Sequence, residues 1–160
     1  MKIAIVPGSF DPMTVGHLDV IKRAAAVFDC VVVAVMINET KEYTFSMEER
    51  LKIAELTCKN LDNVKVLSDG GMLTDLAERE GACAIVKGIR NSNDLEYEEK
   101  MARYNSSVSP NIHTVFLLAD EKVAHVSSTE VRARLEKNAD VFDLISENAL
   151  SFVLKKASKQ

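Results

Sequence analysis

Three separated motifs in the sequence carry residue types that bind phosphate groups. The first occupies residues 8–17 and reads Gly-Ser-Phe-Asp-Pro-Met-Thr-Val-Gly-His. Its glycines permit close approach of a ligand to the backbone, and the free N–H groups at the start of the following helix form an anion site. His17, at the head of that helix, is placed to donate to a phosphate oxygen as negative charge develops there. The alternative is a tight turn followed by an exposed histidine.

The other two motifs lie later in the chain. Residues 87–90 read Lys-Gly-Ile-Arg at the end of a predicted strand, where the glycine allows a turn close to a ligand and the two cations can clamp phosphates. Residues 126–132 read Val-Ser-Ser-Thr-Glu-Val-Arg. Ser127 and Glu130 fit a capping box, and the same helix start can hold a triphosphate tail. The alternatives are a solvated strand end and an ordinary capped helix.

Two further side chains are weaker candidates. Lys41, in the polar stretch 38–46 that we expect to be mobile, could swing onto phosphates when substrate arrives. Glu98 could accept hydrogen bonds from a ribose. Taken alone, both residues are better explained as ordinary solvated surface residues.

The elements that must position these motifs follow an alternating pattern. Short runs rich in Val and Ile predict strands at residues 3–6, 31–37, 64–67, 84–87 and 113–118, and amphipathic stretches predict helices at 17–28, 47–59, 73–80, 94–105, 128–137 and 147–156. This alternation predicts an α/β fold, a doubly wound (Rossmann-like) five-stranded parallel sheet with helices on both faces. We expect the last two helices to pack on the sheet. Ligands of such sheets bind beyond the carboxyl ends of the strands, where the strand order reverses, and the three motifs follow strands one, four and five.

Length, charge and cysteine use narrow the class of protein. The 160 residues, 47% of them hydrophobic, suffice for one domain spanning 1–160. Acidic residues outnumber basic ones by 24 to 20, so no general attraction to nucleic acid or to an anionic membrane is expected. The apolar run at 3–6 is too short for a signal peptide, so a cytoplasmic location is expected. Cys30, Cys58 and Cys83 lack the spacing of a zinc site or disulfide scaffold and are predicted to lie in the core.

In their order and spacing, these motifs resemble the phosphopantetheine adenylyltransferase family (bacterial type) of the nucleotidyltransferase superfamily, and the resemblance covers nearly the whole chain. Residues 14–17 and 126–132 resemble signatures shared across the superfamily, so they indicate the reaction class. Two further features of the resemblance indicate the acceptor. One is the Gly-Ser-Phe-Asp-Pro opening with Thr14, and the other is the stretch 87–90 followed by Asp94, Tyr97 and Glu98.

The resemblance implies transfer of the adenylyl group of ATP to 4'-phosphopantetheine, giving dephospho-coenzyme A and pyrophosphate in coenzyme A biosynthesis. It also implies use of Mg²⁺, a homohexamer, and no metal ligand from the protein itself. The implied catalytic residues are His17, as transition-state stabiliser, Lys41 and Arg90. The implied acceptor-binding residues are Ser9, Lys41, Leu73 and Lys87. The implied ATP-binding residues are Ser9, Phe10, His17, Gly88, Ile89, Arg90, Glu98, Val123, Ala124, His125, Val126, Ser127, Ser128 and Thr129.

Three positions depart from the family pattern. Ser9 stands where threonine is common, and it keeps the hydroxyl group. Lys87 replaces the usual arginine, which keeps the charge but loses the planar fork that grips a phosphate with two bonds. Val123 stands where many members carry an aromatic residue, so packing near the adenine is expected to differ.

The implied reaction requires no general base from the protein. The acceptor phosphate is already an anion at neutral pH, so it can attack the α-phosphorus of ATP in line without a general base or an enzyme-bound intermediate. Three alternatives stay open at this point. They are the same transfer, from ATP or CTP, to nicotinate mononucleotide or an alcohol phosphate; a non-catalytic nucleotide-binding module; and a doubly wound domain for another ligand.

Overall fold

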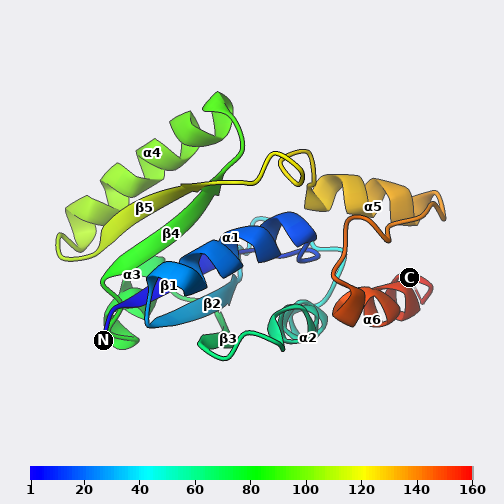
Figure 1. Cartoon of the computed structure of the whole chain (residues 1–160), viewed down its shortest axis with the longest axis horizontal. Coiled ribbons are helices and arrows are strands. Elements are labelled where there is room, and N and C mark those ends of the chain that lie inside the picture. The colour runs from blue at the N-terminus through cyan, green and yellow to red at the C-terminus, as the bar shows by residue number, and fades with distance from the viewer. Residues whose placement is uncertain (160) are drawn as a thin grey trace.

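The computed structural model describes residues 1–159 and contains one five-stranded parallel sheet (Figure 1). Its strands are β1 (Ile3–Gly8), β2 (Cys30–Met36), β3 (Val64–Asp69), β4 (Ala84–Ile89) and β5 (His113–Leu118), in the order β3-β2-β1-β4-β5. Strands of a parallel sheet are buried on both faces, which is why they read as short, nearly continuous apolar runs. The five predicted strands are confirmed, with ends that differ by at most two residues.

Within residues 1–159, six helices connect the strands or follow the last of them: α1 (Val15–Val27), α2 (Met47–Cys58), α3 (Leu73–Arg79), α4 (Ser92–Val108), α5 (Ser128–Glu136) and α6 (Glu147–Ala157). α4 begins two residues earlier than predicted, because the Asn91 side chain caps it by accepting from the Asp94 N–H at 3.0 Å. The capping box predicted at the start of α5 is only half formed. Ser127 Oγ accepts from the Glu130 N–H at 3.2 Å, but the Glu130 carboxylate pairs with Arg134 at 2.8 Å instead of returning to the cap.

Helices cover both faces of the sheet, as the sequence predicts. On one face Val31, Val33 and Val35 of β2 pack in a core with residues of α1 and α2, and on the other Val32 and Ala34 pack with residues of α3. α4 contacts β4 and β5. The expectation that the last two helices pack on the sheet is wrong. The main contacts of α6 are with α2, beside which it lies in Figure 1. Within residues 1–159, no strand is among the main contacts of α5.

The three cysteines do not share one environment. Cys58 is buried, and its burial raises the pKa of its thiol to about 11. Cys30 is half-buried, whereas Cys83 is exposed, so the prediction that all three lie in the core is wrong. Cys83 directly precedes β4, at the amino end of this interior strand, where its Sγ contacts the Ile3 carbonyl at 3.4 Å.

The order of the strands fixes where a ligand can bind. It reverses between β1 and β4, because β1 continues to β2 on one side of the sheet and β4 continues to β5 on the other. The loops leaving these two strands therefore diverge and leave an opening beyond Gly8 and Ile89. No helix of residues 1–159 combines the length and apolar character required to cross a bilayer.

Candidate active site

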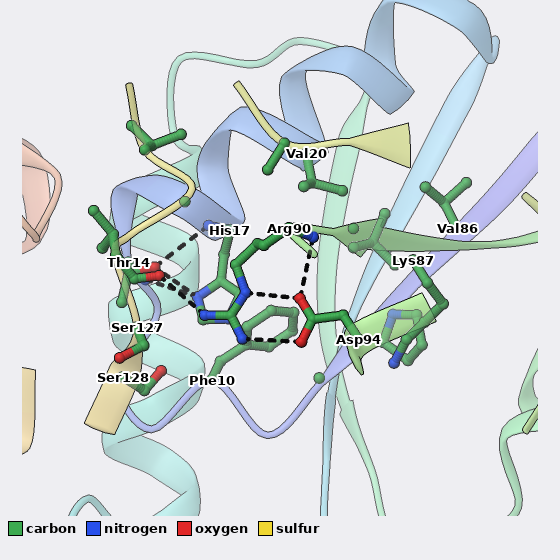
Figure 2. A pocket seen from close by; sticks show the side chains of 18 of the residues that line it. Phe10, Thr14, His17, Val20, Val86, Lys87, Arg90, Asp94, Ser127 and Ser128 are labelled. Atoms are coloured by element: carbon green, nitrogen blue, oxygen red, sulfur yellow. Dashed lines mark hydrogen bonds and ion pairs between the residues drawn. The ribbon is translucent and has the colours of Figure 1, made fainter. Parts of the chain in front are cut away.

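A pocket of about 350 Å³ lies at the carboxyl ends of β1 and β4, where the strand order reverses. All three motifs contribute to it, although they are far apart in the sequence. In Figure 2, His17 from α1, Arg90 from the end of β4, Asp94 from α4 and Ser127 from the start of α5 converge on this space. The residues predicted to bind ATP that line the pocket are Phe10, His17, Gly88, Arg90, Glu98, Val123, Val126, Ser127, Ser128 and Thr129.

The His17 ring is held by the residue that caps its own helix. Nδ1 of His17 accepts from the Thr14 N–H at 3.0 Å, and Thr14 Oγ1 accepts from the His17 N–H at 3.4 Å. This is a capping box with histidine in the place usually taken by Glu or Gln. Phe10 adds an edge-on ring contact with 5.1 Å between centroids. The imidazole is therefore fixed in direction before any ligand arrives.

The same arrangement decides which ring nitrogen carries a proton. A backbone N–H is always a donor, so Nδ1 must be the acceptor, and a neutral imidazole then carries its proton on Nε2. Burial, followed by the charges of Arg90 and Lys87, lowers the pKa of His17 to about 4. At neutral pH the ring is uncharged and offers an Nε2–H donor.

Arg90 is oriented by a carboxylate four residues further along the chain. Its Nε lies 2.9 Å and its Nη2 3.3 Å from the two carboxylate oxygens of Asp94, which also accepts from the Arg90 N–H at 3.1 Å. Mainly through the side-chain hydrogen bond, Arg90 holds the pKa of Asp94 below its usual value. Arg90 Nη1 also reaches the Val126 carbonyl at 3.5 Å, which connects the second motif to the third.

Helix starts supply further donors. Among the N–H groups of residues 14–17 within the described chain, Val15 donates to Leu144 and those of Thr14 and His17 are used in the capping box, which leaves Gly16 for a ligand. The start of α1 therefore offers fewer unused N–H donors to an anion than the sequence predicted. The start of α5 is closer to expectation: Ser128 Oγ donates to the Pro12 carbonyl at 2.8 Å, which places this helix start over the first motif.

Lys87 stands between this pocket and a smaller one. Its Nζ forms an ion pair with Glu98 Oε1 at 3.1 Å, and both residues line both pockets. The second pocket, of about 110 Å³, lies between α4, the start of α3 and the sheet. It is lined by Leu73, Lys87, Tyr97, Glu98, Met101, Ala102, Asn105 and Thr114. Of the residues predicted to bind the acceptor, Leu73 and Lys87 are therefore brought together.

Other predicted site residues lie outside both pockets. Ser9 follows β1, and its carbonyl accepts from the Arg50 guanidinium at 2.7 Å. Lys41 is exposed on the loop after β2. Ile89 is 5% exposed and packs into the core, while Ala124 and the exposed His125 lie in the turn between β5 and α5. The pocket wall from this turn comes from its neighbours Val123 and Val126.

Several lining residues had been given no binding role, although Asp94 and Tyr97 belong to the sequence pattern that indicates the acceptor. Asp94 is four residues after Arg90, the spacing of an ion pair within one turn of helix. Tyr97, Met101 and Asn105 follow one another at intervals of four, which places them on one face of α4. Thr114, on a neighbouring strand, carried no such local signal.

The arrangement suits the recognition of anions more than the binding of a resident metal. Within residues 1–159, His, Cys, Asp and Glu side chains form no group of three or more that could hold a metal ion. The carboxylates in the larger pocket, Asp94 and Glu98, each pair with a cation. A neutral histidine donor, two cations and a helix start thus face the same space.

Known proteins resemble this chain in sequence and in fold. The cytidylyltransferase-like family model matches residues 5–134. The chain is 40% identical over 159 residues to a phosphopantetheine adenylyltransferase of Clostridium novyi (strain NT), with 99% of each chain covered. It is 40% identical over 145 residues to the enzyme of that name from Syntrophomonas wolfei, covering 91% of this chain and 90% of the other.

The fold also matches a solved structure. A Vibrio parahaemolyticus protein, provisionally assigned as a nicotinate-nucleotide adenylyltransferase, superposes with a TM-score of 0.75 over 98% of this chain and 94% of its own. At 20% identity this likeness concerns the fold alone. The full-length relatives and the family model together settle the kinship: the chain belongs to the phosphopantetheine adenylyltransferase family, within the cytidylyltransferase-like group.

Proposed function

We propose that the chain transfers the adenylyl group of ATP to 4'-phosphopantetheine, giving dephospho-coenzyme A and pyrophosphate. Family membership supports this activity. The position of Lys87 supports the assignment of the two substrates to two adjoining pockets. Lys87 lines both the pocket where the three motifs meet and the adjoining pocket under α4. Two anionic reactants bound in these pockets would meet at a cation, which favours their approach.

The reaction is a single displacement at phosphorus. A phosphate oxygen of the acceptor forms a bond to the α-phosphorus of ATP, while the bond from that phosphorus to the oxygen bridging it to the β-phosphorus breaks. Pyrophosphate leaves with the electron pair of the broken bond. The attacking group is already an anion, so no base is required, which agrees with the pairing of Asp94 and Glu98 with cations.

His17 is assigned the stabilisation of the transition state. Its Nδ1 is occupied by the Thr14 N–H, so only Nε2–H is available to the α-phosphate. A neutral donor in a half-buried position gains strength as negative charge accumulates on the phosphoryl oxygens. Arg90, held by Asp94, supplies positive charge on the same side.

The nucleotide is assigned to the larger pocket. The turn containing Val123 and Val126 approaches α1 closely, since a Cβ at Gly16 would lie 3.4 Å from the Val123 carbonyl oxygen. This turn, with its carbonyl and apolar groups, suits the adenine. The β- and γ-phosphates are assigned to the start of α5, where Ser127, Ser128 and Thr129 line the pocket.

The acceptor is assigned to the smaller pocket and the space in front of it. Leu73 and Met101 provide apolar walls for the pantetheine arm, and Asn105 provides an amide for its polar groups. Its phosphate would lie toward Lys87, with Ser9 and Lys41 as further partners that the sequence pattern implies. Lys41 would reach that phosphate from the loop after β2.

Magnesium is assigned to the nucleotide and enters with it as the Mg·ATP complex. Because Asp94 and Glu98 are paired with cations, the phosphate oxygens of ATP and water molecules are the ligands that suit it. Bound there, the ion would neutralise charge on the departing pyrophosphate. Removing it with a chelator should abolish turnover, and adding Mg²⁺ back should restore it.

We further propose that the chain acts in the cytoplasm as a homo-oligomer, a hexamer by analogy with the family. Leu95, Tyr97, Met101, Tyr104 and Val108 of α4 are all more than 40% exposed, an unusual concentration of apolar surface on one helix. Contact with further copies would cover this helix. Light scattering of the purified protein would give the number of copies.

A panel of acceptors tests the activity and the substrate together. The purified chain is offered ATP or CTP with Mg²⁺ and one of 4'-phosphopantetheine, nicotinate mononucleotide or glycerol 3-phosphate, and pyrophosphate release is measured. Release with ATP and 4'-phosphopantetheine alone is expected. Preference for another acceptor would contradict the substrate, release in no mixture would contradict the activity, and a trapped adenylylated protein would contradict the direct displacement.

A further inference from the structure

Lys41 lies at the tip of an exposed loop that is closed by its own hydrogen bonds. We define the Lys41 loop as residues 37–46, between β2 and α2. Asn38 Oδ1 accepts from the Thr40 N–H at 3.0 Å, and the Lys41 N–H donates to the Asn38 carbonyl at 3.0 Å. Where Lys41 projects therefore depends on what holds the residues on either side of this turn.

A buried arginine holds the turn through Tyr43. The Tyr43 hydroxyl accepts from the Asn38 N–H at 2.8 Å, and the guanidinium carbon of Arg50 lies 3.8 Å from the centre of the Tyr43 ring. Arg50 is only 2% exposed, and its Nη1 donates to the carbonyls of Ser9 at 2.7 Å and Met36 at 3.1 Å. One side chain of α2 thus joins the end of β2, the Lys41 loop and the first motif.

A buried carboxylate holds the other arm of the loop. Asp11 is 5% exposed, and its two oxygens accept from the N–H groups of Thr44 and Phe45, each at 2.9 Å. The Asp11 carbonyl in turn accepts from Arg132 of α5 at 2.6 Å. Asp11, in the first motif, therefore connects the Lys41 loop to the helix whose start lines the larger pocket.

These hydrogen bonds connect the first motif and the Lys41 loop to each other and to neighbouring elements. They do not serve the backbone of a single helix or strand. A buried ionic group is costly, and an apolar side chain of similar size would usually serve packing as well. Asp11 and Arg50 nevertheless occupy buried positions and direct their bonds to the backbone of the first motif and of the Lys41 loop. From this we infer that Asp11, Arg50 and Tyr43 are positioning residues that place Lys41 for the acceptor phosphate.

This inference rests on the proposed role of Lys41, and a double-mutant cycle tests it. Tyr43→Leu and Asp11→Asn are made in the native chain and in Lys41→Ala, and kcat and KM for each substrate are measured. In the native chain each should lower kcat/KM for 4'-phosphopantetheine by between about tenfold and a hundredfold, the usual effect of misplacing a catalytic group. In Lys41→Ala the same changes should have little further effect, because the effects of substitutions that act through one group are not additive.

A readout without substrate separates positioning from loss of folding. Trypsin cleaves after exposed lysines in segments that open locally, so cleavage after Lys41 should quicken in Tyr43→Leu and Asp11→Asn, while their thermal unfolding shows that the fold persists. Tyr43→Phe keeps the ring beneath Arg50 and should be affected least. Glu55→Gln, on the solvated side of α2, serves as the matched control, and should change neither cleavage nor turnover.

The possible results bear on the inference in different ways. If Lys41→Ala leaves turnover unchanged, the role of Lys41 in the proposed function is wrong and the inference falls with it. If Lys41→Ala is impaired but Tyr43→Leu and Asp11→Asn reduce kcat/KM equally in both backgrounds, the role of Lys41 stands and the positioning role is overturned. Should Asp11→Asn fail to fold, the two Tyr43 variants carry the test.

Discussion

Thr14 and His17 satisfy each other's backbone at the start of α1: the His17 ring accepts from the Thr14 N–H at 3.0 Å, and the Thr14 hydroxyl accepts from the His17 N–H at 3.4 Å. The cap that begins the helix therefore also selects the tautomer of the histidine. Only Nε2–H is left to face the pocket, and the lowered pKa keeps it uncharged at neutral pH. Helix capping and the proposed stabilisation of the transition state thus depend on the same pair of residues.

Replacing His17 by alanine should reduce kcat by roughly a hundred- to a thousandfold, the typical effect of removing one donor to a transition-state oxyanion. The KM for ATP should change far less, because the bond strengthens only as charge develops. Steady-state kinetics with both substrates measures the two effects separately. His113→Ala, an exposed histidine at the start of β5, is the control and should retain native rates. Near-native turnover of His17→Ala would contradict the assignment.

The lowered pKa of His17 predicts a dependence of stability on pH. The unfolded chain protonates this ring near pH 6.5 and the folded chain only near pH 4, so the unfolded state binds more protons in between. Stability is complete above about pH 6.5 and is lost as the pH falls toward 4, by roughly 3 kcal/mol from this residue. Urea unfolding at pH 7 and pH 4 measures the loss. In His17→Gln the loss over this interval should be smaller, and an equal loss would argue that the ring is not buried as described.

Asp94→Ala should weaken catalysis through Arg90. Without the carboxylate, the guanidinium loses the two bonds that fix its plane, and kcat/KM for ATP should fall by about tenfold, less than in Arg90→Ala. In an Arg90→Ala background the Asp94 change should have little additional effect. Glu96→Gln is a suitable control, since Glu96 forms a solvated pair with Lys100 on the same helix. Additive losses would show that Asp94 acts independently of Arg90.

Gly88→Ala should destabilise the fold for a steric reason. A Cβ at this position would lie 2.5 Å from Cγ2 of Val20, so β4 and α1 would have to separate. Overpacking of this kind costs about 1–3 kcal/mol, measured as a shift of the urea midpoint. Val20→Ala removes the obstructing methyl groups, so adding Gly88→Ala to that variant should cost much less. An equal cost in both backgrounds would indicate a conformational requirement for glycine instead of a close approach.

Much of the fold was available from the sequence because its signals are local. Runs of Val and Ile predicted the strands, and amphipathic stretches predicted the helices. The box expected at Ser127 was only half formed, because Glu130 had a competing partner, Arg134, one turn further along the helix. Positions of the three motifs at strand ends were likewise readable, since the carboxyl ends of parallel strands share one edge of the sheet.

The sequence by itself determined the elements, the motif residues and, through their resemblance to a family, the class of reaction. Only the tertiary structure decided which side chains meet. Arg50 reads as an ordinary charge on an amphipathic helix, yet it is buried against Ser9, and Asp11 binds the backbone of Phe45, 34 positions away. Such contacts depend on the strand order β3-β2-β1-β4-β5 and on the face each helix covers. No local sequence pattern predicts these contacts, because they form only when the fold brings distant segments of the chain together.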